Sequence, residues 1–200
     1  PFHAAGLIRS FAEAEPGVVI RLHELSLVQL ADGLREGSLD FAVTYDQGAP
    51  SDGLSFRPLA ELRPMVVVAQ DHPLAGRGSV DLSELALEPY VMFDAPGSRG
   101  YFEGLLAAGG ISPPVVHAST SMESVRCAVA AGLGFTLLVM RPPSPVTYDG
   151  REVRTVPIRN DLPALRVVLA FREGRHFGRI AQRFSDHAAA CFAARHRRDR

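Results

Sequence analysis

The sequence predicts an α/β fold with parallel sheets that are covered by helices on both faces. Short apolar runs alternate with helix-like segments along most of the 200 residues, and this is the order of elements in α/β proteins. Runs such as "LDFAVTY" (39–45) and "GFTLLVM" (134–140) are almost continuously apolar, as expected for strands buried on both faces. Two extended segments, near 62–69 and 154–165, carry the chain past loops rich in residues that break helices and strands. Two sheets are therefore favoured over one.

In the first half of the chain, turn residues separate each predicted element from the next. The helical spacing of 7–14 stops at "EPG", and the alternating run 18–25 then predicts a strand. Ser26 can cap a second helix, which runs through Leu34 with Gly37 past its end. The other elements of this half are the buried strand 39–45, the strand 62–70, the short helix 81–86 and the strand 89–93.

The second half continues the alternation. A helix over 101–108 is followed by the breaker "GGISPP", and a helix from Ser121 or Met122 to Ala131 ends at Gly132. The connector 141–163 holds five prolines, and its Asp149-Gly150 pair predicts a hairpin with a type I′ turn. The remaining predicted elements are the strands 115–120, 134–140 and 165–171 and the long amphipathic helix 177–196.

Composition excludes several classes of protein. With 21 basic and 22 acidic residues the formal net charge is -1, so no overall field attracts nucleic acid or an anionic membrane. Cys127 and Cys191 are too few for a disulfide framework and fit a reducing compartment. The longest apolar run, 134–140, is far shorter than a membrane span of about 20 residues. We therefore expect a cytoplasmic protein, and the start at Pro1 suggests a fragment of a longer one.

No catalytic constellation is evident, so we expect neither an enzyme nor a cofactor. Ser98 lies in "APGSRG", which lacks the spacing of a nucleophile elbow, and capping is the favoured role for it. His187 and Cys191 are four residues apart on the last predicted helix, a spacing that suits two metal ligands. The sequence suggests no third ligand, so a metal site is not predicted.

Polar residues at strand ends are the best candidates for binding. Four loops of this kind, converging on one cleft, could hold a small polar or anionic molecule through hydroxyls, helix N-termini and one guanidinium. For any one of these residues helix capping is the favoured alternative, so the prediction rests on their joint occurrence. The candidates are Ser26, Leu27, Thr44, Tyr45, Asp94, Ser98, Arg99, Tyr101, Ser119 and Thr120.

Several stretches together resemble one family. They are "LREGSLDFAV", "PMVVVAQDHPLA", "VDLSELALEPYV" and "VAAGLGFTLL", and the match runs over about residues 1–183. They resemble the C-terminal effector-binding domain of LysR-type transcriptional regulators. The resemblance implies a type 2 periplasmic-binding-protein-like fold, with two Rossmann-like lobes joined by two crossover strands. It places lobe I at 1–61 plus 163–200 and lobe II at 62–162.

The resemblance also implies a function. The expected protein is the effector-sensing and oligomerisation domain of a bacterial DNA-binding regulator, with an inducer cleft between its lobes. The expected effector is a small anionic or aromatic molecule, and Arg99 is expected to decide its charge. DNA is expected to bind only to an N-terminal winged helix-turn-helix domain absent from this chain, and no membrane partner is expected. The alternative is a solute-binding receptor of a transport system with the same two-lobe fold.

A homodimer or tetramer is the expected assembly. In the family two such domains pair in an antiparallel manner, so helix 122–131 of one copy would meet helix 7–14 of the other. The residues expected at this contact are Met122, Val125, Cys127 and Val129 on one side and Leu7, Ile8 and Phe11 on the other. Packing of the same residues on their own sheet is the alternative that periodicity leaves open.

Overall fold

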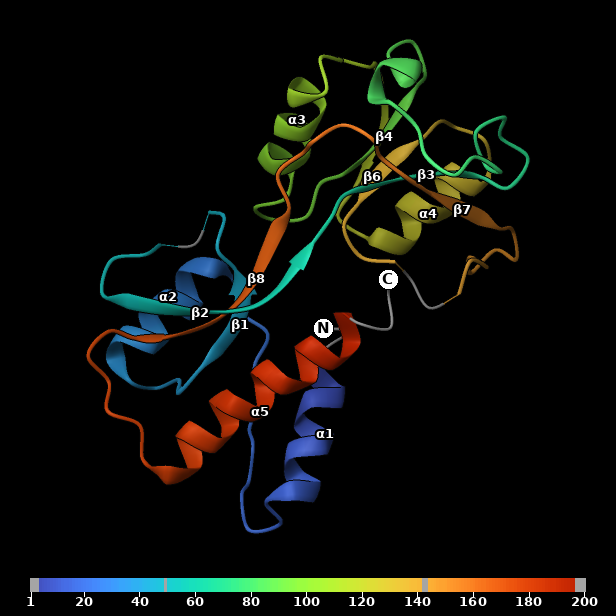
Figure 1. Ribbon diagram of the computed structural model, residues 1–200. Coiled ribbons are helices and arrows are strands. Elements are labelled where there is room, and N and C mark those ends of the chain that lie inside the picture. Colours follow the sequence, from blue (N-terminus) through green and yellow to red (C-terminus); the bar gives the residue numbers. More distant parts are fainter. Residues whose placement is uncertain (1–3, 49, 142–143, 197–200) are drawn as a thin grey trace. The chain divides into compact units, whose positions relative to one another are not determined.

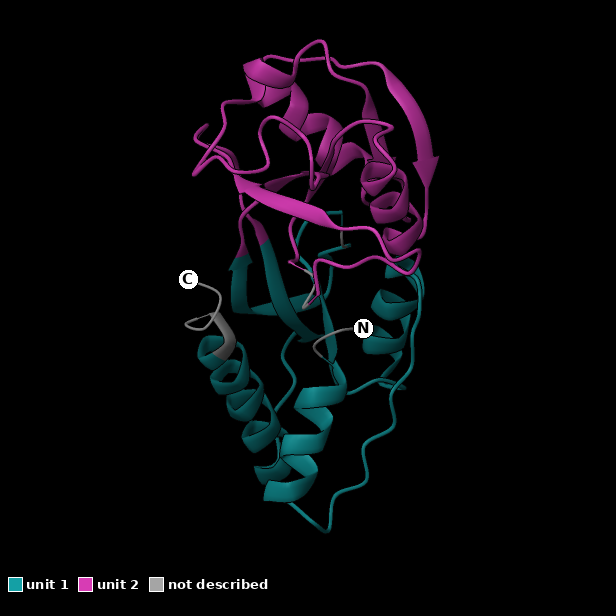
Figure 2. Ribbon diagram, turned by 90° about the vertical axis from the view of Figure 1, so that its right-hand side faces the viewer, with its two compact units in different colours: residues 1–61, 166–200 teal, residues 62–165 magenta. Residues whose placement is uncertain are grey.

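The computed structural model describes residues 4–48, 50–141 and 144–196. The chain forms two compact units (Figure 2): unit 1 is Pro1–Glu61 with Arg166–Arg200, and unit 2 is Leu62–Leu165. It leaves unit 1 at the end of strand β2 (Leu54–Leu62) and returns at the start of strand β8 (Leu165–Arg172). The return crossing thus falls after residue 165, whereas the sequence suggested a boundary at 162–163.

Unit 1 is built on a three-stranded sheet in the order β1-β8-β2 (Figure 1). Strand β1 runs antiparallel to β8, with Ala42 opposite Ala170 and Tyr45 opposite Val167. The buried residues Ala31, Leu34, Ala42, Leu54 and Ala170 form one apolar cluster of this unit. The other elements of unit 1 are α1 (Ala4–Ala14), α2 (Leu27–Glu36), β1 (Ala42–Tyr45) and α5 (Arg179–His196).

Helix α2 begins and ends as the sequence predicts. The Ser26 hydroxyl accepts a hydrogen bond from the Gln29 amide, and the Gln29 side chain accepts one from the Ser26 amide, which completes a capping box. Gly37 ends the helix in the left-handed conformation, with φ of 79°.

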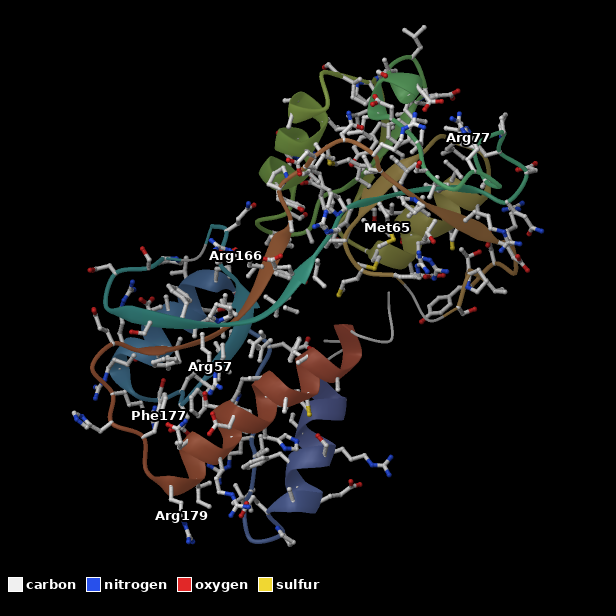
Figure 3. All side chains as sticks on the ribbon, in the orientation of Figure 1. Arg57, Met65, Arg77, Arg166, Phe177 and Arg179 are labelled. Carbon is white, nitrogen blue, oxygen red and sulfur yellow. The ribbon has the colours of Figure 1, made fainter. Side chains whose placement is uncertain are left out.

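Contacts with α1 and with β2 hold α5 in unit 1. The Phe184 ring packs edge-on against Phe11 of α1, with their centroids 5.1 Å apart. Arg57 extends from β2 toward α5 (Figure 3), where its Nη1 donates to Ser185 Oγ and Asp186 Oδ1, both at 2.7 Å. The long C-terminal helix is therefore joined both to α1 and to the crossing strand β2.

Unit 2 contains a mixed sheet. Strands β4 and β5 are parallel, β4 meets β6 through a parallel bridge between Tyr90 and Phe135, and β3 is antiparallel to both β6 and β7. The elements are β3 (Met65–Ala69), the 3₁₀ helix η1 (Leu82–Leu85), β4 (Tyr90–Phe93), α3 (Arg99–Ala108), β5 (Val115–Ser119), α4 (Met122–Ala130), β6 (Thr136–Leu138) and β7 (Val153–Pro157).

Strands β3, β4 and β6 of this unit are buried on both faces, and successive residues of each strand point to opposite faces. Val66, Met92 and Leu137 belong to one apolar cluster, which includes Phe102 and Leu105 of α3. Their chain neighbours Val67, Val91 and Leu138 belong to a second cluster, which includes Val125 and Val129 of α4. The continuously apolar strands of the sequence thus fill two cores.

The expectation of parallel sheets is wrong for three of the described strand pairs, because β1–β8, β3–β6 and β3–β7 are antiparallel. Where a helix connects two strands, as in β4-α3-β5, the pair is parallel, as a βαβ crossover requires. Strand β3 instead follows β2 after only Arg63 and Pro64, and β8 likewise follows an extended segment. No helical crossover sets the direction of these strands, and they pair antiparallel.

The strand predicted over 18–25 is also absent from the described residues. This segment has no regular secondary structure, and Val19 and Leu22 are 86% and 56% exposed. A strand needs a hydrogen-bonding neighbour, and none of the described strands pairs with 18–25. The alternating pattern alone was therefore insufficient to predict a strand in this segment.

The hairpin in the connector exists, but its turn is of another type. Gly150 donates to the Thr147 carbonyl at 2.9 Å, so Tyr148 and Asp149 are the central residues. Gly150 has φ of 83°, whereas no described residue other than glycine has a positive φ. A type I′ turn at Asp149-Gly150 would require a positive φ at both residues.

The sequence analysis did not predict strand β2, because Pro58 interrupts its pattern.

Gly134 provides a test of the β4–β6 contact. Its φ is 147°, and a Cβ there would lie 2.1 Å from the Pro89 carbonyl oxygen, which accepts the Phe135 amide at 2.9 Å. We expect Gly134→Ala to lower the free energy of unfolding by about 2 kcal/mol or more. Gly104→Ala, in open space on α3, should instead stabilise by up to about 1 kcal/mol. Urea unfolding measures both, and equal effects would contradict the packing described.

Candidate functional site

The candidate residues of unit 2 lie together where two adjacent strands end. Strands β4 and β5 are parallel, so the loops after them start from the same edge of the sheet. Phe93 lies opposite Ser119, and the Asp94 amide donates to the Ser119 carbonyl at 2.9 Å. The structure therefore brings Asp94, Ser98, Arg99 and Ser119 into one region.

Arg99 is already paired with carboxylates. Its Nε and Nη2 donate to the two oxygens of Asp94 at 2.9 and 2.5 Å, and its Nη1 donates to Glu103 at 3.3 Å. The hydrogen bond and charge of Arg99 lower the pKa of Asp94, and the same contact raises the pKa of Arg99. The Arg99 side chain is still 47% exposed, so solvent reaches it. Two carboxylates and one guanidinium give this cluster a net negative charge.

The hydroxyls of unit 2 have local partners. Ser98 Oγ donates to the carbonyls of Ala95 and Phe93, at 2.7 and 3.0 Å, and makes no cap hydrogen bond to α3. Ser119 Oγ accepts the Ser121 amide at 3.1 Å, and Thr120 is exposed. The hydroxyls of Ser98 and Ser119 are thus held in place by the backbone, and the expected capping role of Ser98 is not the one observed.

Tyr101 connects the start of α3 to the segment before β8. Its hydroxyl donates to the Pro163 carbonyl at 3.1 Å. Burial raises the pKa of the Tyr101 phenol to about 12, so the hydroxyl keeps its proton at physiological pH. A candidate residue is thereby attached to the segment through which the chain returns to unit 1.

In unit 1, Leu27 and Thr44 line one small cavity. Its volume is about 10 Å³, and the rest of its lining is apolar, including Ala31, Leu54 and Phe56. This volume has room for about one water molecule, so the cavity is too small for an effector. Ser26 serves as the cap of α2, and burial raises the pKa of the Tyr45 phenol.

The sequence analysis missed a buried ion pair on α4. Arg126 is 6% exposed, pairs with Glu123 at 2.5 Å, and donates from Nη2 to the carbonyls of Ser144 and Val146 at 2.7 and 3.2 Å. Glu123 in turn accepts the Tyr148 amide at 2.7 Å. Hydrogen bonds from this ion pair hold loop 144–148 against α4. The Glu-x-x-Arg spacing on a predicted helix was a signal that could have revealed it.

Within the described part of the chain, no three side chains of the His, Cys, Asp and Glu types are grouped so that they could hold a metal ion. Nor does any described helix combine the length and the apolar character needed to cross a bilayer.

The Asp94–Arg99 pair can be tested by titration. Because the Arg99 contact lowers the Asp94 pKa, the stabilisation from this pair is present above the ordinary aspartate pKa of about 3.9 and is lost as pH falls through the lowered value. We expect Arg99→Ala to return the Asp94 pKa toward about 3.9, as measured by carboxyl NMR. Arg77→Ala, which removes a partner of Glu84, should leave Asp94 unchanged. An unchanged Asp94 pKa in Arg99→Ala would contradict the pairing.

The chain resembles known proteins over nearly its whole length. The family model of the LysR substrate binding domain matches residues 1–192. HinK, a LysR family transcriptional regulator from Pseudomonas aeruginosa, is 34% identical with a TM-score of 0.89, over 96% of this chain and 66% of HinK. The C-terminal domain of a LysR family regulator from Rhodococcus sp. RHA1 is also 34% identical, with a TM-score of 0.83 over 92% of this chain and 90% of that domain.

More distant comparisons agree with this assignment. A hydrogen peroxide-inducible genes activator from Pectobacterium carotovorum is 30% identical over 87% of this chain and 57% of its own length. The chain spans about half to three-fifths of the length of the curated relatives it matches. The effector-binding domain of BenM, solved with benzoate, is 17% identical over 96% of this chain and 86% of its own length, with a TM-score of 0.79, and shows the shared fold alone. The chain therefore belongs to the LysR substrate-binding domain family of transcriptional regulators and has its periplasmic-binding-protein-like α/β fold.

Proposed function

We propose that this chain is the effector-sensing and oligomerisation domain of a bacterial LysR-type regulator that acts in the cytoplasm. The family match and the similarity to HTH-type regulators support this function. DNA binding belongs, in this proposal, to a winged helix-turn-helix domain outside these 200 residues. The transport-receptor alternative is not favoured, because the relatives described above are regulators.

One observation carries the proposed binding mode, namely the exposed bidentate ion pair of Arg99 with Asp94 at the edge where β4 and β5 end. A carboxylate effector presents the same two oxygens as Asp94 and can take its place on the guanidinium. The proposed event is therefore an exchange of partners on Arg99. Because Asp94 competes for this position, weak anions bind poorly and the effector needs further contacts.

Those further contacts come from the other candidate residues. In unit 2 the hydroxyls of Ser98, Ser119 and Thr120 can accept or donate hydrogen bonds after small rotations. Ser26, Leu27, Thr44 and Tyr45 of unit 1 stay a prediction from the sequence pattern and the family resemblance, because the cavity that Leu27 and Thr44 line is too small for an effector. An aromatic effector would pack on the apolar members of this set.

Effector binding must favour one of two states to regulate anything. Tyr101 supplies a physical route, since it follows Arg99 closely on α3 and bonds to the Pro163 carbonyl ahead of β8. A shift of the α3 N-terminus when Asp94 is displaced would alter this bond. The consequence would be a change in the segment that connects the two units.

The exchange is tested with two substitutions of opposite expected effect. A panel of small carboxylates is screened by thermal shift, and the affinity of any hit is then measured by calorimetry. Arg99→Ala should weaken a carboxylate by more than about tenfold, because a charge-assisted pair is lost. Asp94→Asn should strengthen it a few-fold, because the competing carboxylate is removed while the shape is kept.

Controls make the result decisive. Arg77→Ala removes an exposed arginine of the same unit and should leave affinity unchanged. If Arg99→Ala binds the carboxylate as tightly as the unsubstituted chain, the exchange is wrong. If instead no carboxylate or aromatic acid in the panel binds, the proposed effector class is wrong.

Dimerisation is the second part of the proposal, and the structure corrects its residues. Leu7, Phe11, Val125 and Val129, which were expected at the contact, are at most 4% exposed and lie in the cores of their own units. Val125→Glu is therefore expected to unfold unit 2 rather than to yield monomers. Ile8, Met122 and Cys127 are partly exposed and remain available.

We place the contact of unit 2 on strand β5 and the outward side of α4. None of the residues of β5 is buried, and Val115 and Val116 are 50% and 53% exposed. Within the described residues β5 pairs only with β4, so one of its edges carries free backbone groups. An exposed edge strand with apolar side chains is typical of a surface that a second copy covers.

Val116→Glu is the test of this interface. A charge at the centre of an apolar contact should yield folded monomers, as measured by light scattering and circular dichroism. Leu87→Glu is the matched control, because Leu87 is 95% exposed elsewhere in unit 2 and its substitution should leave dimers intact. Folded dimers of Val116→Glu would show that the interface lies elsewhere.

A further inference from the structure

Three chemically reactive side chains meet between α1 and α5. Ser10 of α1 lies opposite His187 and Cys191, which are one turn apart on α5. Ser10 Oγ is 2.8 Å from His187 Nε2 and 3.4 Å from Cys191 Sγ. An imidazole nitrogen and a thiol sulfur are thus both within 3.4 Å of one hydroxyl oxygen.

Ser10 also has a backbone partner. Its hydroxyl donates to the Leu7 carbonyl at 3.1 Å, and a carbonyl can only accept. The same oxygen faces His187 Nε2 and Cys191 Sγ, and the tautomer of His187 sets which atom of the Ser10–His187 pair donates. With Nε2 and Sγ both deprotonated, the three atoms would offer nitrogen, sulfur and oxygen lone pairs to a single cation.

The surroundings hold these groups in position and leave them accessible. The His187 ring packs edge-on against the buried Phe11 ring, with centroids 5.4 Å apart, which restricts its rotation. Cys191 forms no disulfide. Ser10, His187 and Cys191 are all half-buried, so an ion can reach them from solution while part of its hydration shell is excluded.

We propose that Cys191 Sγ and His187 Nε2 bind a borderline or soft transition-metal ion such as Zn²⁺, with Ser10 Oγ as a third contact. Thiolate and imidazole are the preferred ligands of such ions, and the i, i+4 spacing on a helix places both on one side. On binding, the Cys191 thiol releases its proton to solvent, and the neutral imidazole binds as the tautomer that carries its proton on Nδ1. Water completes the coordination, so the site is open and exchangeable.

Occupation would join α1 to α5 within unit 1. The helices already meet through Phe11 and Phe184, and the ion would add a bridge from α5 to Ser10 of α1. The bound state should therefore be more stable than the free one, by mass action. This site involves none of the proposed effector-binding residues, so its test is independent of the proposed function.

Co²⁺ and Zn²⁺ are the probes, because a thiolate bound to Co²⁺ gives a charge-transfer absorption that Zn²⁺ then abolishes by displacement. The chain is titrated at micromolar metal with a reductant that contains no thiol. Cys191→Ser and His187→Ala should each weaken Zn²⁺ by more than about tenfold. Cys127→Ser and His176→Ala are the matched controls at a second half-buried thiol and an exposed imidazole, and both should bind normally.

The thermal readout separates a metal site from ordinary helix packing. Zn²⁺ should raise the Tm of the unsubstituted chain and of Cys127→Ser, but not that of Cys191→Ser or His187→Ala. Ser10→Ala should retain the Co²⁺ absorption with affinity reduced a few-fold. The proposal is overturned if micromolar metal produces neither absorption nor a Tm shift, or if the absorption persists in Cys191→Ser or disappears in Cys127→Ser.

Discussion

The simultaneous burial of both faces of the unit 2 sheet is the constraint on which the candidate site depends. Neighbouring residues such as Val66 and Val67, or Leu137 and Leu138, enter different cores, so a slip of one residue in any strand would exchange the two sets. Helices α3 and α4 must therefore cover the sheet, and the short loops that lead into them start where β4 and β5 end. The positions of Asp94, Arg99 and Ser119 follow from this arrangement of apolar side chains. A polar site is placed here by hydrophobic packing.

Much of the fold was readable from the sequence, because local signals and tertiary packing agree there. The Ser26 cap, the Gly37 terminator and the apolar run of β6 each predict an element that the structure contains. The errors arise where a distant partner decides the outcome. Residues 18–25 alternate as a strand does, yet no described strand pairs with them, and β2 forms despite Pro58 because β8 lies beside it. Strand direction was wrong for the same reason, since periodicity carries no information about which strands are neighbours.

The proximity of three candidate residues was predictable from the sequence, but their side-chain contacts were not. Parallel strand ends could be inferred from the alternation of elements, and Asp94, Ser98 and Arg99 do lie together. The sequence does not tell, however, that Arg99 is already engaged by two carboxylates, because this depends on side-chain direction at a helix start. Similarly, helical spacing places Val125 on an apolar face of α4, but it does not reveal whether that face packs in the core of unit 2 or against a second copy. Such distinctions require the geometry of neighbouring elements, as does the meeting of Ser10 with His187 across 177 residues.

The discontinuity of unit 1 bears on how the protein is made. Its sheet has the order β1-β8-β2, so the central strand is the last one to be synthesised, and β1 and β2 have no direct pairing with each other. During translation the first 61 residues must therefore wait, without their middle strand, while all of unit 2 emerges from the ribosome. Unit 2 is a continuous stretch with its own two cores and can fold first. The apolar face of α1, which packs on α5, stays uncovered throughout that interval, which makes this segment a natural client of chaperones.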